Sequence, residues 1–526
     1  MSMKQMNSGS EVDEKLAALM TNASAVSAIA AAVEGTIGPK GLDTMLVDRF
    51  GDVVITNAGV TILDKMDVNH PAARMLINIA KAQQDEIGDG TTTATIVAGA
   101  LVAEGVNQVV RGVPVARVIE GMRVGVRAAL KSVEQRSRRI TGMDDQILER
   151  IAYISGREHE DIAQLVVSAA RLIGREKLQD KSFKLSDTII AQEGADNEVF
   201  MGVILEKERL NKQMPQELQG VRVLIIDDAL EPEEIEEEAL GTEAGFGKYL
   251  ELQQEFKLNL EKLVALGVNL VLVDRSVHDL AEETLTDANV MVLSRVSGRE
   301  LRKAAEHTGA RMIKRTALKK DISEIERYLG RAERALEDEK LGQVRLVGGS
   351  GKPMATVLVG AATSEVVGER ERIAKDAASS TQAAVRGGYV PGGGSVELAA
   401  ARDVERSRET IKGMAAYGVD CVAAALRRPL SQIVANAGFN PLEKVEDVIA
   451  LQAEQGKDSL AVNCDDGTVA DMISLGVMDP TLVKLHALRA AGEIAEAILR
   501  IDTIIKKKDE DGGAKPTGPA PGGMDF

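Results

Sequence analysis

The chain has 526 residues, of which 44% are hydrophobic and 28% are charged, so it carries enough apolar material for several cores. The formal net charge is -17, and aromatic residues make up only 2% of the chain. The negative charge opposes binding to a phosphate backbone, and the scarcity of aromatics removes the stacking surfaces that single-stranded nucleic acid needs. We therefore expect a globular protein of about three to four domains with no nucleic-acid partner.

The first section predicts helices that pack through small aliphatic side chains. Apolar residues recur at helical spacing from Leu16 to Val33, and a strand–turn–strand pattern follows at residues 44–56. Further helices are expected over residues 72–85 and 94–110, and after Pro114, because proline suits the first turn of a helix.

The middle section has the pattern of an α/β unit with its own sheet. Three continuous apolar runs, at 221–230, 268–274 and 288–296, are rich in Val, Ile and Leu, and helical stretches follow them. Residues 343–360 predict a β-hairpin around a Gly/Pro turn. The acidic run from Glu231 to Glu238 indicates either a solvated face or an exposed extension of the domain.

The last section, from about residue 395, is helical and alanine-rich like the first, so we expect the two ends to fold together with the middle as an insertion. The tail is polar and rich in Gly and Pro, which predicts disorder. Cys421 and Cys464 have no disulfide or zinc pattern, so we expect two small buried side chains. There is no signal-peptide core and no run of about 18 apolar residues, so we expect a cytoplasmic protein without a membrane partner.

The stretch EIGDGTTTAT, residues 86–95, has the residue types of a phosphate site. Gly88 and Gly90 let the backbone approach a ligand, and Thr91–Thr93 open a helix whose free N–H groups and dipole favour an anion. Asp89 would repel phosphate by itself, but it suits a Mg²⁺ ion that bridges to phosphate oxygens. An elaborate helix cap with a strained turn is the alternative, and these residues alone favour neither.

Two further glycine loops could complete such a site. TIGPKG, residues 36–41, could wrap a phosphate with Lys40 or form a surface turn. Pro391–Gly394, PGGG, could make room for a ribose or act as a hinge. GSGKP is not a P-loop, because Leu346 and Pro353 stand where a glycine and a hydroxyl residue belong.

Taken together, the motifs resemble those of a chaperonin subunit: TIGPKG, TNAGVTIL, GDGTTTAT, PGGG, VMDP and the ending GGM occur in family order. Within that family, the group II (thermosome-like) branch is the most similar, on the segments LRID, RIAKDA and the one after DDALEP. One interpretation is that the chain is a bacterial member of that branch. In that branch a helical protrusion acts as a built-in lid. The resemblance therefore implies a double ring that encloses unfolded protein clients, with no separate co-chaperonin lid. Because the sequence is a single chain, we expect the subunits to be identical.

The same resemblance implies a multidomain fold with three parts and a tail. These are a mostly α-helical, discontinuous equatorial ATP-binding domain (1–140 and 397–510), a small α/β intermediate hinge domain (141–210 and 357–396), an α/β apical client-binding domain (211–356) with its lid protrusion at about 231–260, and a disordered tail (511–526).

The resemblance also implies ATP or ADP and Mg²⁺ as ligands, with roles carried over by motif. Asp89 matches the metal ligand, and Asp376 in KDA matches the acid that positions the attacking water. The other matched positions lie in the loop at the nucleotide, the phosphate cradle, the ribose turn and the adenosine side: Thr36, Ile37, Gly38, Pro39, Asn57, Gly90, Thr91, Thr92, Thr93, Gly393, Gly394, Asn463 and Asp479. Phosphoryl transfer needs metal, donors and an aligned nucleophile.

Two positions depart from the family pattern. Ala58 stands where the family usually has Asp, near the metal and the water, so we expect slow or absent hydrolysis; engineering and natural divergence would both explain it. Arg157 stands where relatives tend to carry a phosphate-sensing Lys, and its broader fork puts that role in doubt.

We expect an ATP-driven protein-folding machine with ATPase activity. The alternative is a ring scaffold that binds nucleotide with impaired hydrolysis. A monomeric small-molecule kinase would need a second substrate pocket, which the sequence does not indicate.

Overall fold

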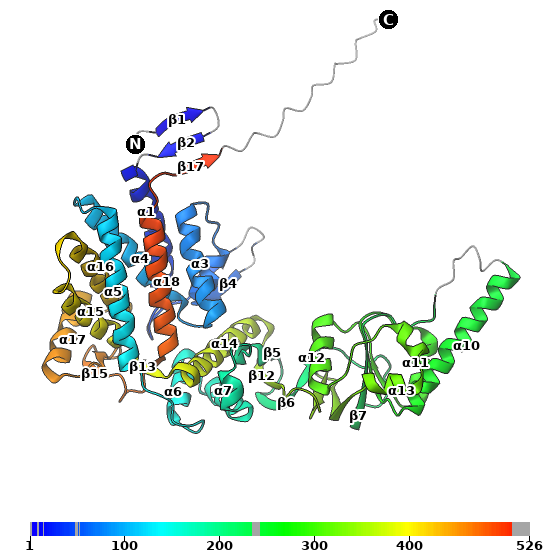
Figure 1. The fold of residues 1–526 in the computed structure, drawn as a ribbon. Coiled ribbons are helices and arrows are strands. Elements are labelled where there is room, and N and C mark those ends of the chain that lie inside the picture. The colour runs from blue at the N-terminus through cyan, green and yellow to red at the C-terminus, as the bar shows by residue number, and fades with distance from the viewer. Residues whose placement is uncertain are drawn as a thin grey trace, which may run out of the picture. The chain divides into compact units, whose positions relative to one another are not determined.

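The computed structural model describes residues 3–7, 10–13, 15–47, 51, 53–233 and 242–507. It divides into two compact units (Figure 1). Unit 1 joins the two ends of the chain, Met1–Arg139 and Gly387–Phe526, and unit 2 is the segment Ile140–Arg386 between them. The finer division of the chain into equatorial, intermediate and apical domains stays a prediction.

Unit 1 is built mainly from helices. Its elements are β1 (Met3–Asn7), β2 (Ser10–Asp13), α1 (Lys15–Glu34), β3 (Thr44–Val47), β4 (Val53–Thr56), α2 (Gly59–Lys65), α3 (Pro71–Glu86), α4 (Thr91–Val110), α5 (Val115–Arg136), β13 (Tyr389–Pro391), α15 (Ser395–Arg408), α16 (Ala416–Asn436), α17 (Pro441–Gln455), β14 (Leu460–Val462), β15 (Val469–Asp471), β16 (Met478–Pro480), α18 (Thr481–Leu499) and β17 (Ile505–Lys507).

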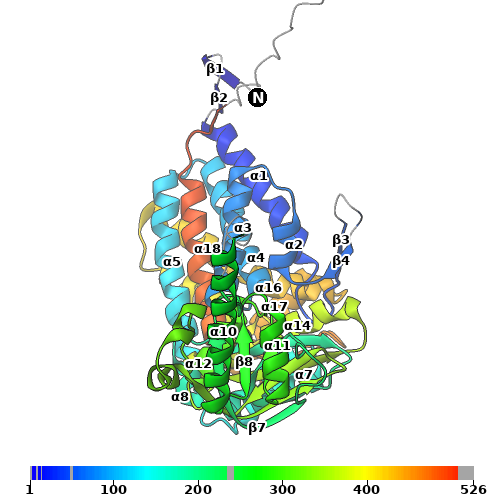
Figure 2. The ribbon, with the colours of Figure 1, turned by 90° about the vertical axis from the view of Figure 1, so that its right-hand side faces the viewer.

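The core of unit 1 surrounds α4, which packs against α1, α3, α16 and α18. Small side chains such as Ala94 and Ala98 let these helices approach closely. Figure 2 shows β3 and β4 as a separate two-stranded ladder at the edge of the helices. The strands predicted within residues 44–56 are confirmed, although residues 48–50 and 52 lie outside the described residues.

Within the described residues, α1 and α4 are long and apolar enough to cross a membrane by length and composition alone. Neither helix contains an unbroken apolar run of about 18 residues, which is the signal on which the sequence prediction rested. The apolar stretch of α4 is 61% buried and that of α1 is 39% buried, and the two helices pack on each other. A core helix passes the same test, because alanine, valine and leucine serve both environments.

Unit 2 contains a mixed eight-stranded sheet in the order β5-β12-β6-β11-β10-β7-β8-β9. Its elements are α6 (Gln146–Ser155), α7 (Glu160–Ile173), α8 (Arg175–Gln179), β5 (Ile189–Glu193), β6 (Glu198–Leu205), β7 (Glu217–Ile226), α10 (Glu243–Ala265), β8 (Leu270–Val273), α11 (Asp279–Asp287), β9 (Met291–Leu293), α12 (Gly298–Thr308), α13 (Ile322–Ile325), β10 (Gly330–Asp338), β11 (Gln343–Val347), β12 (Ala355–Ala361) and α14 (Ser364–Gly387), which ends at the border with unit 1.

The three apolar runs form the strands β7, β8 and β9, as predicted, and the structure shows that these strands pair in parallel. Both faces of these strands are covered, so alternate residues enter different cores. Leu224 and Ile226 pack toward α10 and α11, whereas Val223 and Ile225 pack toward α12. Burial on both faces is why these strands read as continuous apolar runs.

The hairpin predicted at residues 343–360 was wrong. Its two strands exist as β11 and β12, but both pair with β6, which lies between them in the sheet. Residues 348–354 connect them, a longer segment than the two- to five-residue loops of ordinary hairpins.

Several predictions fall partly or wholly on residues outside the described ranges. They include residues 234–241 of the predicted lid and acidic run, and the tail from residue 508 onward. The described part of the lid segment is helical, and Thr242 caps α10 by accepting a hydrogen bond from the Gly245 amide. Both cysteines are free: Cys421 is buried as expected, whereas Cys464 is only half-buried.

Candidate functional site

The loop before α4 forms an open helix N-terminus. Gly90 is the N-cap residue and adopts a left-handed conformation, φ +79°, so no side chain caps the first turn. A β-carbon at Gly90 would lie only 2.4 Å from Val483 Cγ1, which makes glycine necessary here. The amides of Thr91–Thr93 therefore begin a helix without a side-chain cap, at the position where a bound anion would be stabilised.

The TNAG segment lies against this loop. A β-carbon at Gly59 would lie 2.5 Å from Thr92 Oγ1, so the two segments are in direct contact. Ala58 is the N-cap residue of α2 and provides no capping hydrogen bond. Its amide donates to Thr56 Oγ1 at 3.1 Å. The position where the resemblance led us to expect a carboxylate is thus adjacent to the threonine loop.

The TIGPKG loop is held by α16. Asn436 Nδ2 donates to the carbonyls of Glu34 and Ile37 at 2.8 and 2.9 Å. Gly38, at φ +88°, packs against Ile433, also on α16. This loop therefore follows the position of α16.

Lys40 does not project freely from its loop. Its ammonium forms a 2.7 Å ion pair with Asp465. Asn463 lies in the same turn as Asp465, and its Oδ1 accepts a hydrogen bond from the Asp465 amide. The side chain of Asn463 thus closes its own turn next to the TIGPKG loop. This ion pair does not support the alternative from the sequence analysis in which Lys40 contacts a phosphate.

The triple-glycine turn faces Asp479. β13 and β16 pair with Val390 opposite Asp479, and a β-carbon at Gly392 would lie 3.1 Å from Asp479 Oδ2. Gly393 and Gly394 have φ of +63° and +80°. Gly394 packs against Leu430 of α16, the helix that also supports Gly38. The predicted loops of unit 1 are thus connected by a few contacts: α16 contacts both Gly38 and Gly394, and Val483 contacts Gly90.

Asp479 belongs to a buried ion cluster. Lys484 Nζ lies 2.7 Å from Asp479 Oδ2 and 2.6 Å from Glu397 Oε1. Burial acts to lower the pKa of Lys484, but the two carboxylates outweigh it and raise the pKa well above its usual range. The lysine is therefore charged, and its position fixes one oxygen of Asp479.

Arg157 and Asp376 belong to unit 2. Arg157 has φ +54° and forms a 2.6 Å ion pair with Glu369 of α14. Asp376 lies on the same helix, half-buried. Their predicted roles at the nucleotide stay predictions.

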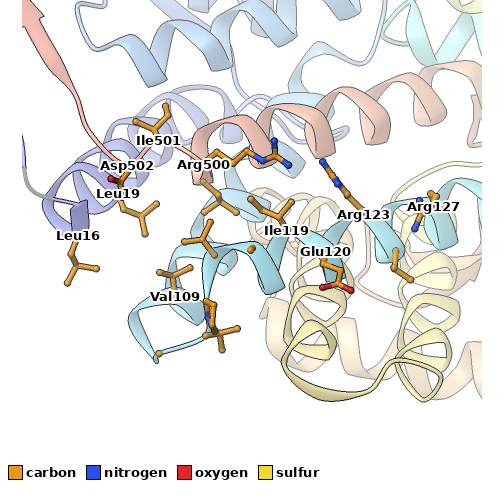
Figure 3. Close-up of a pocket in the computed structure, with 17 residues that line it drawn as sticks. Leu16, Leu19, Val109, Ile119, Glu120, Arg123, Arg127, Arg500, Ile501 and Asp502 are labelled. Carbon is orange, nitrogen blue, oxygen red and sulfur yellow. The ribbon is translucent and has the colours of Figure 1, made fainter.

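A cavity of about 1250 Å³ in unit 1 contains none of the predicted site residues (Figure 3). Apolar side chains of α1, α4 and α5 line it together with Arg123 and Arg127 of α5 and Arg500, which follows α18. We therefore identify the candidate site by the residue types of its loops and not by this cavity. A nucleotide held by backbone amides and a metal does not require a deep apolar cavity.

Three buried polar residues at the site were missed by sequence reasoning: Gln83, Glu397 and Lys484. Each occupies the buried stripe of its helix. Lys484, for example, precedes the buried residues Ala487, Leu488 and Ala491 at helical spacing. A charged or amide residue on an otherwise apolar helix face was the available signal.

Comparisons with known proteins agree with the motifs. Residues 29–509 match the model of the TCP-1/cpn60 chaperonin family. The chain is 31% identical over 521 residues to thermosome subunit beta of Sulfurisphaera tokodaii, covering 94% of this chain and 93% of that one. It is 33% identical over 518 residues to a thermosome subunit of Pyrococcus abyssi, with the same coverage, 94% and 93%.

The crystal structure of a group III chaperonin in the open state is similar throughout. The TM-score is 0.87 at 47% sequence identity, covering 93% of this chain and 99% of that chain. This similarity confirms the predicted multidomain fold class. On the family model, the relatives and the fold together, the chain belongs to the TCP-1/cpn60 chaperonin family.

Proposed function

We propose that this chain is the subunit of an ATP-dependent chaperone, with its nucleotide at the open N-terminus of α4. The observation that carries the proposal is that predicted nucleotide-binding segments lie against that helix end or against the start of α18, which contacts it through Val483. Gly59 contacts Thr92, Val483 lies against Gly90, and Gly392 faces Asp479. Each contact brings another predicted nucleotide-binding segment to the same region.

The donor set fits a magnesium nucleotide. No group of three His, Cys, Asp or Glu that could hold a metal occurs within the described ranges. Mg²⁺ suits such a site, because it commonly takes one or two carboxylates and completes its shell with water and phosphate oxygens. Asp89 would hold the ion, which when bound would neutralise phosphate charge. The α4 amides would donate to phosphate oxygens, and Asp479 would face the ribose.

We also propose that hydrolysis is slow because Ala58 provides no carboxylate. Asp376 alone would then orient the attacking water. Ala58→Asp tests this, with Ala58→Asn as the matched control, because Asp and Asn cap α2 about equally well but only Asp adds a charge. We expect Ala58→Asp to raise ATP turnover many-fold over both the parent chain and Ala58→Asn. Equal turnover in the two variants would contradict the assigned role of position 58.

The chaperone cycle would follow from ATP favouring one conformation of the subunit. Identical subunits would form two stacked cytoplasmic rings, unfolded proteins would enter the cavity, and the lid at about 231–260 would close it without a co-chaperonin. Thermosome relatives and the group III chaperonin structure support this reading. Electron microscopy of the purified particle tests it: a monomer or an open filament would contradict it.

Ala58 also favours a second candidate, a ring scaffold that binds nucleotide with impaired hydrolysis. The two functions differ in refolding. A denatured client should regain activity faster with the chain and ATP than with the chain alone if it is a folding machine. For the scaffold, ATP should make no difference.

A further inference from the structure

Helix α18 begins between the two halves of the candidate nucleotide site. Asp479 precedes the helix by two residues, at the ribose side. The side chain of Val483 lies against Gly90, at the metal side. The start of α18 therefore lies beside both the loop that carries Asp89 and the carboxylate that faces the triple glycine.

Gln83 connects the metal-side loop to this helix. It lies at the end of α3 and is 0% exposed. Its Nε2 donates to the carbonyl of Asp89 at 2.7 Å and to the carbonyl of Val483 at 3.3 Å. Because both carbonyls need a donor, Oε1 must face His486, whose Nδ1 lies 2.6 Å away and donates to it. Every polar atom of the Gln83 side chain is thus used.

Lys484 connects the ribose side to the same helix. Its side chain is 8% exposed and bridges Glu397, 1% exposed, and Asp479, 25% exposed. Apart from this ammonium, Glu397 finds no donor in the part of the chain that the structure describes. Glu397 therefore fixes Lys484, and Lys484 fixes Oδ2 of Asp479. The ion pair engages Oδ2 of Asp479, and the side chain stays 25% exposed, so we assign Oδ1 to a ligand hydroxyl.

We propose that Gln83 and Lys484 are positioning residues, which fasten the Asp89 loop and the Asp479 carboxylate to the first turns of α18. The proposal rests on the nucleotide site proposed above. Gln83 acts on the metal side, by holding the backbone of Asp89 against that of Val483. Lys484 acts on the side of the ribose hydroxyls. Loss of either residue should impair recognition of one part of the ligand. A general loss of stability would instead weaken binding of every nucleotide to the same extent.

The test uses the full chain and titration calorimetry with three probes: ADP with Mg²⁺, ADP with EDTA, and 2′,3′-dideoxy-ADP with Mg²⁺. We expect Gln83→Met to weaken binding of ADP by about 10-fold to 100-fold in Mg²⁺ and to leave binding in EDTA unchanged. We expect Lys484→Met to weaken ADP about tenfold with and without Mg²⁺. It should also abolish the preference for ADP over the dideoxy nucleotide.

Matched controls separate these effects from instability. Gln343→Met removes an equally buried glutamine in unit 2 and should leave all three affinities unchanged. Lys484→Arg keeps the charge and should restore the ribose preference in part. If Lys484→Met does not assemble, Lys484→Met/Glu397→Gln, which removes both buried charges, serves the same comparison.

The outcomes distinguish the two proposals. If the parent chain binds none of the probes, the proposed function fails. If the parent binds ADP and depends on Mg²⁺ and the ribose hydroxyls, but both variants keep that dependence, the positioning roles are refuted while the function stands. An equal loss for all three probes would show that Gln83 and Lys484 only stabilise the fold, and would also refute the proposal.

Discussion

Gly90→Ala would test the geometry of the helix end on which the candidate site depends. A left-handed φ of +79° costs a residue with a β-carbon about 1–2 kcal/mol. The new methyl would also lie 2.4 Å from Val483 Cγ1, and relieving such an overlap costs about 1–3 kcal/mol. The loop should therefore lose about 2–5 kcal/mol of local stability.

The two parts of this loss can be separated by two further variants. Gly112, at φ +98°, has no neighbour within 4 Å of the position that a β-carbon would take. Gly112→Ala should therefore lose only the stability that the left-handed backbone conformation costs. Val483→Ala removes the atoms that overlap with the new methyl. Gly90→Ala/Val483→Ala should thus lose less stability than the sum of the single losses, by about 1–3 kcal/mol.

Native-state hydrogen exchange suits this measurement, because a chain of two units need not unfold in one step. In Gly90→Ala, the amides of the first turns of α4 should exchange about 30-fold faster or more. Exchange that stays at the parent rate would refute the close approach of Val483 to Gly90. So would a double variant whose loss equals the sum of the two single losses.

Asp471 and Cys421 provide two further predictions. Burial opposes the charge of Asp471, but Lys457, Ser459, Ser474 and the Ile473 amide outweigh it and lower its pKa to about 2. The resulting stabilisation is complete well above pH 3.8 and is lost as the pH falls through about 2. Asp471→Asn should therefore lower the stability by about 2 kcal/mol at pH 7 and by little near pH 2, as measured by hydrogen exchange of residues 457–476. A loss of stability that does not depend on pH would contradict the assignment. Burial raises the pKa of Cys421 to about 12. A thiol reagent at pH 8 should therefore modify Cys421 far more slowly in the native chain than in urea, as measured by mass spectrometry. Equal rates of modification would contradict the burial of this thiol.

The sequence predicted elements better than their pairing. Val, Ile and Leu runs identified β7, β8 and β9, because strands buried on both faces carry no polar alternation. β11 and β12 were identified in the same way, but their partner β6 lies more than a hundred residues earlier in the chain. Strand pairing over such a distance depends on tertiary packing, which local patterns do not contain.

The site divides in a similar way. The residue types of the EIGDGTTTAT stretch led to the predictions for Asp89 and Gly90, whereas Asp479 was predicted only from the resemblance of VMDP to the family motif. Neither signal located Gln83 or Lys484, whose partners are the Val483 carbonyl and Glu397, far away in the sequence. The pairing of Lys40 with Asp465 was equally invisible, since it depends on how two distant loops meet. Supporting residues were therefore the least predictable part of the site.

Strand β6 has a mechanical consequence for unit 2. Residues 198–201 pair with β12, and residues 202–205 pair with β11, so a single extended segment belongs to both ladders. Gly202 lies at the changeover, where its carbonyl accepts a hydrogen bond from Thr356. A force on one ladder would therefore pass to the other along the covalent backbone of β6, without an intervening loop.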